Sequence, residues 1–125
     1  YVKLSDTIRQ LNNIQIIWVF GPDDLGVKEN IIGLIPDSDL IYKPPTLLDY
    51  CFLIRDSELL VSTSTGPMHL AGVLNIKTIS FFGSNLFASP ERWSTVSDAD
   101  RQNNFIVNQS FNLDDVERVF YQILC

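Results

Sequence analysis

Residues 61–71 read VSTSTGPMHLA and join an apolar strand to a helix through four successive hydroxyl side chains. Gly66 and Pro67 open the helical pattern, and proline is tolerated in a first helical turn because its missing N–H would have no partner there. The first N–H groups of a helix lack intrahelical partners and lie at the positive end of its dipole, so a bound anion gains hydrogen bonds and charge stabilisation together. This stretch therefore predicts a phosphate-binding corner between a strand and a helix.

Apolar runs and helical patterns alternate on both sides of this corner. The predicted strands cover residues 14–20, 40–42, 58–62, 77–82 and 105–107. The predicted helices run from an N-cap at Ser5 to Asn12 or Asn13, and over residues 23–35, 46–55, 67–74 and 113–124. Strands separated by helices pair in parallel through right-handed crossovers. The predicted fold class is α/β, a three-layer sandwich around a parallel sheet.

Size and charge restrict the partners. At 125 residues with 46% hydrophobic content, the chain is one domain by length and can bury a core. Fifteen acidic against nine basic residues give a net charge of -6 without a basic cluster, so nucleic-acid binding is not expected. The chain carries neither a signal peptide nor an apolar run of membrane-spanning length, and Cys51 and Cys125 follow no metal-type spacing. We expect free thiols, a cytoplasmic protein and, since the chain begins at Tyr1, a piece of a longer one.

Polar residues follow three of the predicted strands, where ligands bind in open parallel sheets. The candidates for phosphate are Ser64, Thr65, Gly66, Pro67, Met68, His69, Gly83, Ser84 and Asn85. The candidates for a ribose are Asp23 and Asp24. Residues 84–104 form a long loop, of a length that is more often functional than idle. No metal site is predicted.

Each candidate also has a purely structural interpretation, and both interpretations stay open. A hydroxyl before a Gly-Pro helix start is a normal N-cap, and acids such as Asp23 and Asp24 are favoured in a first helical turn by the dipole alone. His69 can be a structural histidine, and Gly83 can serve backbone geometry. A serine nucleophile is not expected, because the sequence around Ser64 lacks the G-x-S-x-G elbow.

With those residues in place, residues 59–84, LLVSTSTGPMHLAGVLNIKTISFFGS, resemble the signature of the heptosyltransferase family. These bacterial enzymes add heptose from ADP-heptose to the lipopolysaccharide core. The family pattern is Asp-(Ser/Thr)-Gly-x-x-His-Leu-Ala, then a short helix, a strand and Phe-Gly-(Pro/Ser)-Thr. Residues 65–71 and residues 82–84 occupy the matching places. Ser64 stands where the family has aspartate, so a neutral hydroxyl replaces a carboxylate that could form the stronger, charge-assisted hydrogen bond.

The resemblance implies a metal-independent glycosyltransferase of GT-B type. Residues 1–125 would be its Rossmann-like C-terminal half, the donor-binding domain, possessing no catalytic residue of its own. The N-terminal half, with the acceptor site and the general base, would lie outside this chain, as would the first strand and a phosphate-binding lysine ahead of the first helix. The implied co-substrate is a nucleotide-sugar, ADP-heptose, with no further cofactor. The implied acceptor is a lipid-linked saccharide, which would make the full enzyme peripheral to the inner membrane.

Other classes of function remain open. A degenerate glycosyltransferase domain kept for binding or assembly is favoured by the serine at position 64, and half of a nucleotide-sugar epimerase would have a similar build. A receiver-like signalling module is disfavoured, because it needs an aspartate where this chain has Ser62 to Thr65. A missing strand would also leave unpaired sheet edges, which favours self-association.

Overall fold

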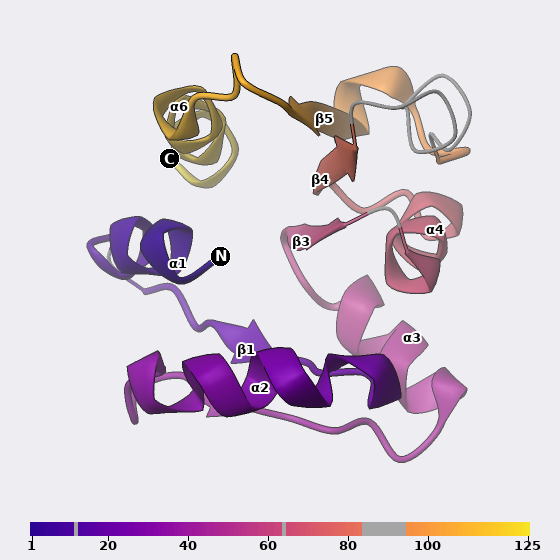
Figure 1. Cartoon of the computed structure of the whole chain (residues 1–125). Coiled ribbons are helices and arrows are strands. Elements are labelled where there is room, and N and C mark those ends of the chain that lie inside the picture. The colour runs from indigo at the N-terminus through magenta and orange to yellow at the C-terminus, as the bar shows by residue number, and fades with distance from the viewer. Residues whose placement is uncertain (12, 64, 84–94) are drawn as a thin grey trace. The chain divides into compact units, whose positions relative to one another are not determined.

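The structure is a computed structural model, and it describes residues 1–11, 13–63, 65–83 and 95–125 (Figure 1). The chain divides into two compact units, Tyr1–Pro45 and Thr46–Cys125. We describe each unit by itself.

The first unit contains a short parallel pair of strands between helical segments. Its elements are α1 (Val2–Arg9), β1 (Ile17–Trp18), the 3-10 turn η1 (Pro22–Asp24), α2 (Leu25–Ile31), the 3-10 turn η2 (Ile32–Leu34) and β2 (Leu40–Ile41). β1 pairs in parallel with β2, with Ile17 opposite Leu40. The continuous helical stretch from Pro22 to Leu34 confirms the predicted second helix.

Three expectations for the first unit were wrong. Ser5 is not an N-cap: it lies inside α1, and its hydroxyl donates to the carbonyl of Val2 at 2.6 Å. The predicted strand over residues 14–20 shrinks to the two residues of β1, because β2 is equally short and the prolines that follow it lack the N–H a ladder needs. α1 also ends at Arg9 with a right-handed C-cap at Gln10, before the predicted end at Asn12 or Asn13. Asn13 adopts the left-handed conformation, with φ 64°, in the turn that follows.

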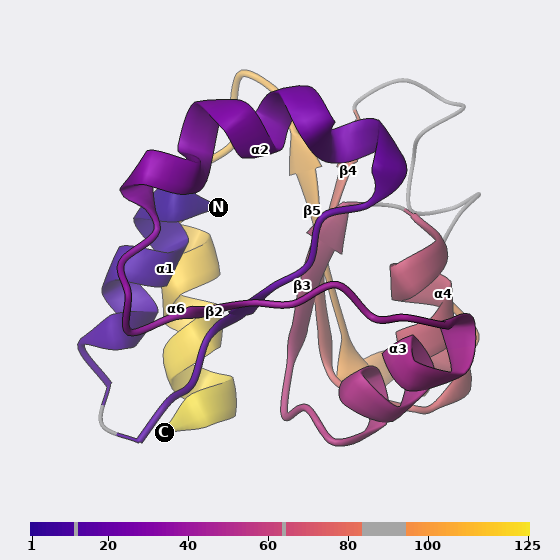
Figure 2. The same ribbon diagram turned by 90° about the horizontal axis from the view of Figure 1, so that it is seen from below.

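The second unit contains a parallel sheet in the order β3-β4-β5. Its elements are α3 (Leu47–Arg55), β3 (Leu60–Thr63), α4 (Gly66–Val73), β4 (Thr78–Gly83), the 3-10 turn η4 (Ala99–Arg101), β5 (Gln102–Val107) and α6 (Leu113–Leu124). Figure 2 shows α3 and α4 on one side of this sheet and α6 on the other. The predicted three-layer α/β arrangement with parallel strands is confirmed.

β5 begins at Gln102, three residues before its predicted start. The polar run over residues 102–104 looks like loop sequence, but its amides have partners in the fold. The Gln102 side chain donates to the carbonyls of Thr95 at 3.1 Å and Ser97 at 2.7 Å, and Asn103 donates to the carbonyl of Thr78 at 3.1 Å. These hydrogen bonds compensate for the desolvation of polar side chains that the sequence pattern alone predicts to be exposed.

The central strand β4 lies in the core of the second unit. Ile79 and Phe82 from β4, Met68 and Ala71 from α4, and Val116 and Phe120 from α6 are all buried. α4 packs against both β3 and β4, so the β3–α4 corner rests on a well-packed sheet. Among the described residues, no helix combines the length and apolar character needed to cross a bilayer.

Candidate functional site

The corner between β3 and α4 is built by hydroxyl groups that bond to the turn rather than to the helix. Thr65 occupies the N-cap position in extended conformation, yet its side chain accepts no hydrogen bond from the helix N–H groups. Its Oγ1 lies 3.0 Å from Ser62 Oγ and 3.3 Å from the carbonyl oxygen of Thr63. The Ser62 hydroxyl in turn donates to that carbonyl at 2.9 Å. The capping interpretation of Thr65 is therefore wrong for this structure.

The first turn of α4 has N–H groups without a partner among the described residues. The first backbone bond along the helix runs from the N–H of His69 to the carbonyl of Thr65 at 3.3 Å. Pro67 has no N–H, and no described residue accepts from the N–H groups of Gly66 and Met68. Such groups at a helix N-terminus favour an anion.

The corner is open to solvent. A Cβ built on Gly66 would meet no heavy atom within 4 Å, and Thr65 and His69 are exposed. The Met68 side chain is fully buried in the core, so its backbone N–H is the part that remains available to a ligand. Among the described residues, no packed side chain would have to move for a group to bind at this helix end.

Gly83 ends β4 at the same edge of the sheet. Thr63 at the end of β3 lies opposite Phe81, two residues before Gly83. The second unit thus gathers Thr65, Gly66, Pro67, His69 and Gly83 at the carboxyl edge of its strands. Ser64, Ser84 and Asn85 lie outside the described residues.

Asp23 and Asp24 belong to the first unit and are exposed. The Asp24 carboxylate accepts the N–H of Gly21 at 2.8 Å, the role expected of an acid at a helix start. This contact agrees with the structural interpretation of Asp24 and leaves its second oxygen available.

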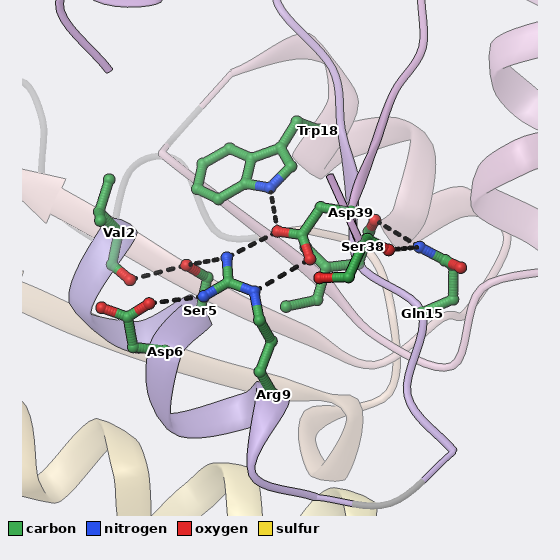
Figure 3. A network of polar contacts seen from close by, with 9 residues as sticks. Val2, Ser5, Asp6, Arg9, Gln15, Trp18, Ser38 and Asp39 are labelled. Atoms are coloured by element: carbon green, nitrogen blue, oxygen red, sulfur yellow. Dashed lines mark hydrogen bonds and ion pairs between the residues drawn. The ribbon is translucent and has the colours of Figure 1, made fainter. Parts of the chain in front are cut away.

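A charge cluster around the buried carboxylate of Asp39, in the first unit, was not predicted from the sequence (Figure 3). Arg9 binds both oxygens of Asp39, Nε to Oδ1 at 3.0 Å and Nη2 to Oδ2 at 2.6 Å. Trp18 Nε1 donates to Asp39 Oδ2 at 2.8 Å, and the Asp39 side chain is 2% exposed. The Arg9 guanidinium holds the pKa of the Asp39 carboxyl below its usual range, against the opposing effect of burial. Arg9 and Asp39 are thirty positions apart, so no local pattern could have paired them.

Two buried hydroxyls in β4 were missed as well. The side-chain oxygens of Thr78 and Ser80 are buried without a hydrogen-bond partner. The signal was visible in the alternation of hydroxyl and apolar residues over residues 78–82, TISFF, within a strand predicted to be buried.

A hollow of about 280 Å³ lies at the opposite, amino edge of the sheet. It is lined by Ser57, Glu58, Ile76, Lys77, Arg101 and Ile123. None of the candidate residues lines it, so the chemistry that the sequence predicts lies away from this hollow.

Comparison with known proteins identifies the family and the fold. The family model of glycosyltransferase family 9 (heptosyltransferase) matches residues 1–119. A Haemophilus influenzae protein named "Putative glycosyltransferase" is 30% identical over 88 residues, which are 69% of this chain and 25% of that protein. The chain thus spans about a quarter of the length of this curated relative.

Two solved structures share the fold. The family 9 glycosyl transferase from Veillonella parvula superposes with a TM-score of 0.65 at 12% identity, over 97% of this chain and 33% of that one. The E. coli heptosyltransferase WaaC, solved with ADP, gives a TM-score of 0.65 at 15% identity, over 95% of this chain and 38% of that one. The match over residues 1–119 shows that the chain belongs to glycosyltransferase family 9, the heptosyltransferase family.

Proposed function

We propose that this chain is the donor-binding domain of a glycosyltransferase that transfers heptose, or a related sugar, from an ADP-sugar to the lipopolysaccharide core. The observation that carries the proposal is the uncapped, solvent-open N-terminus of α4 at the carboxyl edge of a parallel sheet. ADP is the first nucleotide to test, because the E. coli relative was solved with ADP.

The chemistry proposed for the corner is electrostatic. As the sugar leaves, negative charge develops on the nucleoside diphosphate, and the N–H groups of Gly66 and Met68 with the dipole of α4 would stabilise that charge. The Thr65 hydroxyl and His69 lie exposed on the same first turn and would add hydrogen bonds. The polypeptide around Gly83 would approach the phosphates from the neighbouring strand.

The remaining assignments follow the same proposal. Ser64, Ser84 and Asn85 would complete the phosphate contacts, and Asp23 with Asp24 would accept the ribose hydroxyls. The acceptor, a lipid-linked saccharide, and the general base would come from a half of the enzyme beyond this chain. Such an enzyme would work in the cytoplasm, peripheral to the inner membrane.

The test is calorimetric titration of the protein with ADP, ADP-heptose, UDP and a UDP-sugar. We expect ADP and ADP-heptose to bind and the uridine nucleotides to bind more weakly. Gly66→Val should abolish binding, because its side chain would fill the open space in front of the helix. Gly33→Val is the matched control, since Gly33 also has no heavy atom within 4 Å of a built Cβ and lies in η2, nine residues after Asp24.

Two results would contradict the proposal. Equal ADP affinity in Gly66→Val and the unmodified protein would show that ADP does not bind at the N-terminus of α4. Indifference to every nucleotide would instead favour a degenerate domain kept for binding or assembly.

A further inference from the structure

Ser80, in the middle of β4, has a buried hydroxyl whose desolvation no hydrogen bond compensates. Its hydroxyl is fully buried and has no hydrogen-bond partner, and the same holds for Thr78 two residues earlier. A buried hydroxyl without a partner destabilises the state that contains it, so each such group calls for an explanation.

The neighbours of the two hydroxyls differ. Ser80 lies opposite Ser62 of β3 and Asn104 of β5 in the parallel register, so the two serine side chains share one face of the sheet, and Asn104 is exposed. Thr78 lies opposite Leu60, which offers no hydroxyl, and opposite Gln102, whose amide donates to Thr95 and Ser97. Ser80 therefore has a hydroxyl-bearing residue opposite it on β3, and Thr78 does not.

Ser62 is the link between this strand position and the candidate site. Its hydroxyl donates to the carbonyl of Thr63 at 2.9 Å and lies 3.0 Å from the Thr65 hydroxyl, where either oxygen can be the donor. The Thr65 hydroxyl also donates to the Thr63 carbonyl, at 3.3 Å. Thr65 is the N-cap residue of α4, next to the unused N–H groups. In the free protein the Thr65 proton is thus directed into the turn and away from the helix end.

We propose that Ser80 is a positioning residue for the diphosphate site, acting through Ser62 on Thr65. When the Thr65 hydroxyl turns to donate to a phosphate oxygen, its bond to Ser62 breaks. Ser62, no longer in contact with Thr65, then changes rotamer toward Ser80 and gives up its bond to the carbonyl of Thr63, an exposed residue, and the Ser80 hydroxyl donates to Ser62 Oγ. The buried Ser80 hydroxyl then has a partner, so its destabilising effect is present in the free state and removed in the bound state.

This inference rests on the proposed function and predicts effects of opposite sign for one substitution. Ser80→Ala removes the unpartnered hydroxyl, so the free protein should melt at a higher temperature. The same change removes a hydrogen bond of the bound state, so ADP should bind about three- to tenfold more weakly. A purely structural role for Ser80 would change the melting temperature and leave ADP affinity unaltered.

The experiment measures thermal unfolding and ADP affinity in Ser80→Ala and in Thr78→Val as the matched control. Thr78→Val also removes a buried unpartnered hydroxyl, and it should raise the melting temperature without changing ADP affinity. In a Ser62→Ala background, adding Ser80→Ala should not weaken ADP binding further, because the bond between the two hydroxyls is already absent.

The outcomes separate this inference from the proposed function. If the unmodified protein binds no ADP, the proposed function fails first and the inference falls with it. If the unmodified protein binds ADP and Ser80→Ala binds it equally well, the inference alone is overturned. Additive losses in the double variant, or a loss in Thr78→Val as large as that in Ser80→Ala, would overturn it too.

Discussion

Two threonines at helix starts, Thr46 and Thr65, have different roles, and the residue three positions later differs between them. Thr46 and Thr65 both precede a helix in extended conformation. Thr46 accepts the N–H of Asp49 at 3.1 Å, and the Asp49 carboxylate accepts the N–H of Thr46 at 3.1 Å in return. The residue three positions after Thr65 is Met68, which cannot reciprocate. One threonine therefore closes its helix end, and the other leaves it open.

This difference predicts different consequences for the two threonines. Thr46→Ala should lower the free energy of unfolding by about 1 kcal/mol, the usual value of an N-cap. Thr65→Ala should change it by less than about 0.5 kcal/mol, as for a surface substitution, and should instead weaken ADP binding. Urea unfolding and ADP titration of both variants check this, and an equal stability loss in the two would show that Thr65 caps α4 after all.

The Asp39 carboxylate makes stability depend on pH. Above the ordinary aspartate pKa of about 3.9 the ionised group contributes in full. As the pH falls below that value the unfolded chain takes up its proton first, and the contribution is lost until the pH passes the lowered native pKa. Asp39→Asn should cost about 3 kcal/mol at pH 7, because it leaves Arg9 without its buried partner, and should flatten the acid limb of the stability profile.

The control for this prediction is Asp6, which also pairs with Arg9 but has a side chain that is 64% exposed. Asp6→Asn should cost less than about 1 kcal/mol, as exposed pairs do. Unfolding free energies measured from pH 7 down to pH 2 would compare the three proteins. Parallel acid limbs for Asp39→Asn and the unmodified protein would show that another group carries the pH dependence.

The element that most depends on close packing is α4. A Cβ built on Gly72 would come within 2.5 Å of the Thr95 Cβ, so the polypeptide around Thr95 lies directly on the helix. Just beyond the helix, Asn75 has φ 55° and exchanges two hydrogen bonds with Asp98, at 2.9 Å and 3.0 Å. The polypeptide between Thr95 and Asp98 is thus attached to the C-terminal end of α4, opposite the candidate site.

This packing predicts a steep cost for a small change. Gly72→Ala should destabilise the protein by about 1–3 kcal/mol through overpacking, although alanine is the better helix former. Gly26→Ala in α2, where a Cβ has open space, should stabilise by about 0.5–1 kcal/mol. Adding Thr95→Gly to Gly72→Ala should recover part of the loss, because it removes the clashing Cβ. A Gly72→Ala protein as stable as the unmodified one would refute the close contact.

At the scale of the whole molecule, the two units differ in how their strands are supported. β4 is flanked by β3 and β5 and is buried along most of its length, whereas β1 and β2 form a two-residue pair with Ile17, Leu40 and Ile41 exposed. Local opening is easier where few apolar groups are buried. The chain spans 25% of the length of its curated relative and 33% and 38% of the two solved structures.

Native-state hydrogen exchange should resolve this difference. The amides of Ile79 to Phe82 in β4 should exchange most slowly, and those of Leu40 and Tyr42, which bond to the β1 segment at 2.9 Å, should exchange faster. Equal protection in both units would show that they open as one cooperative body. Added ADP should slow exchange at the start of α4 before it affects β2.

Short-range patterns in the amino-acid order were sufficient to locate the helices, the parallel strands of the second unit and the corner around Gly66, because caps, apolar periodicity and Gly-Pro turns act over a few residues. The same patterns misjudged Ser5, residues 14–20 and the start of β5. For residues 14–20 and β5, pairing with other strands overrides local preference. Ser5 instead lies inside α1, and its hydroxyl donates to the carbonyl of Val2 three residues earlier.

Contacts between distant residues settled the rest. The Arg9–Asp39 pair, the fit of Gly72 against Thr95 and the unpartnered hydroxyl of Ser80 exist because folding brings together groups that no local window contains. The sequence alone also does not decide whether Thr65 caps its helix. Its hydroxyl could bond to the N–H groups of α4 or to the oxygens of Ser62 and Thr63. The bend of the chain at the end of β3 favours the latter partners and leaves the helix terminus open.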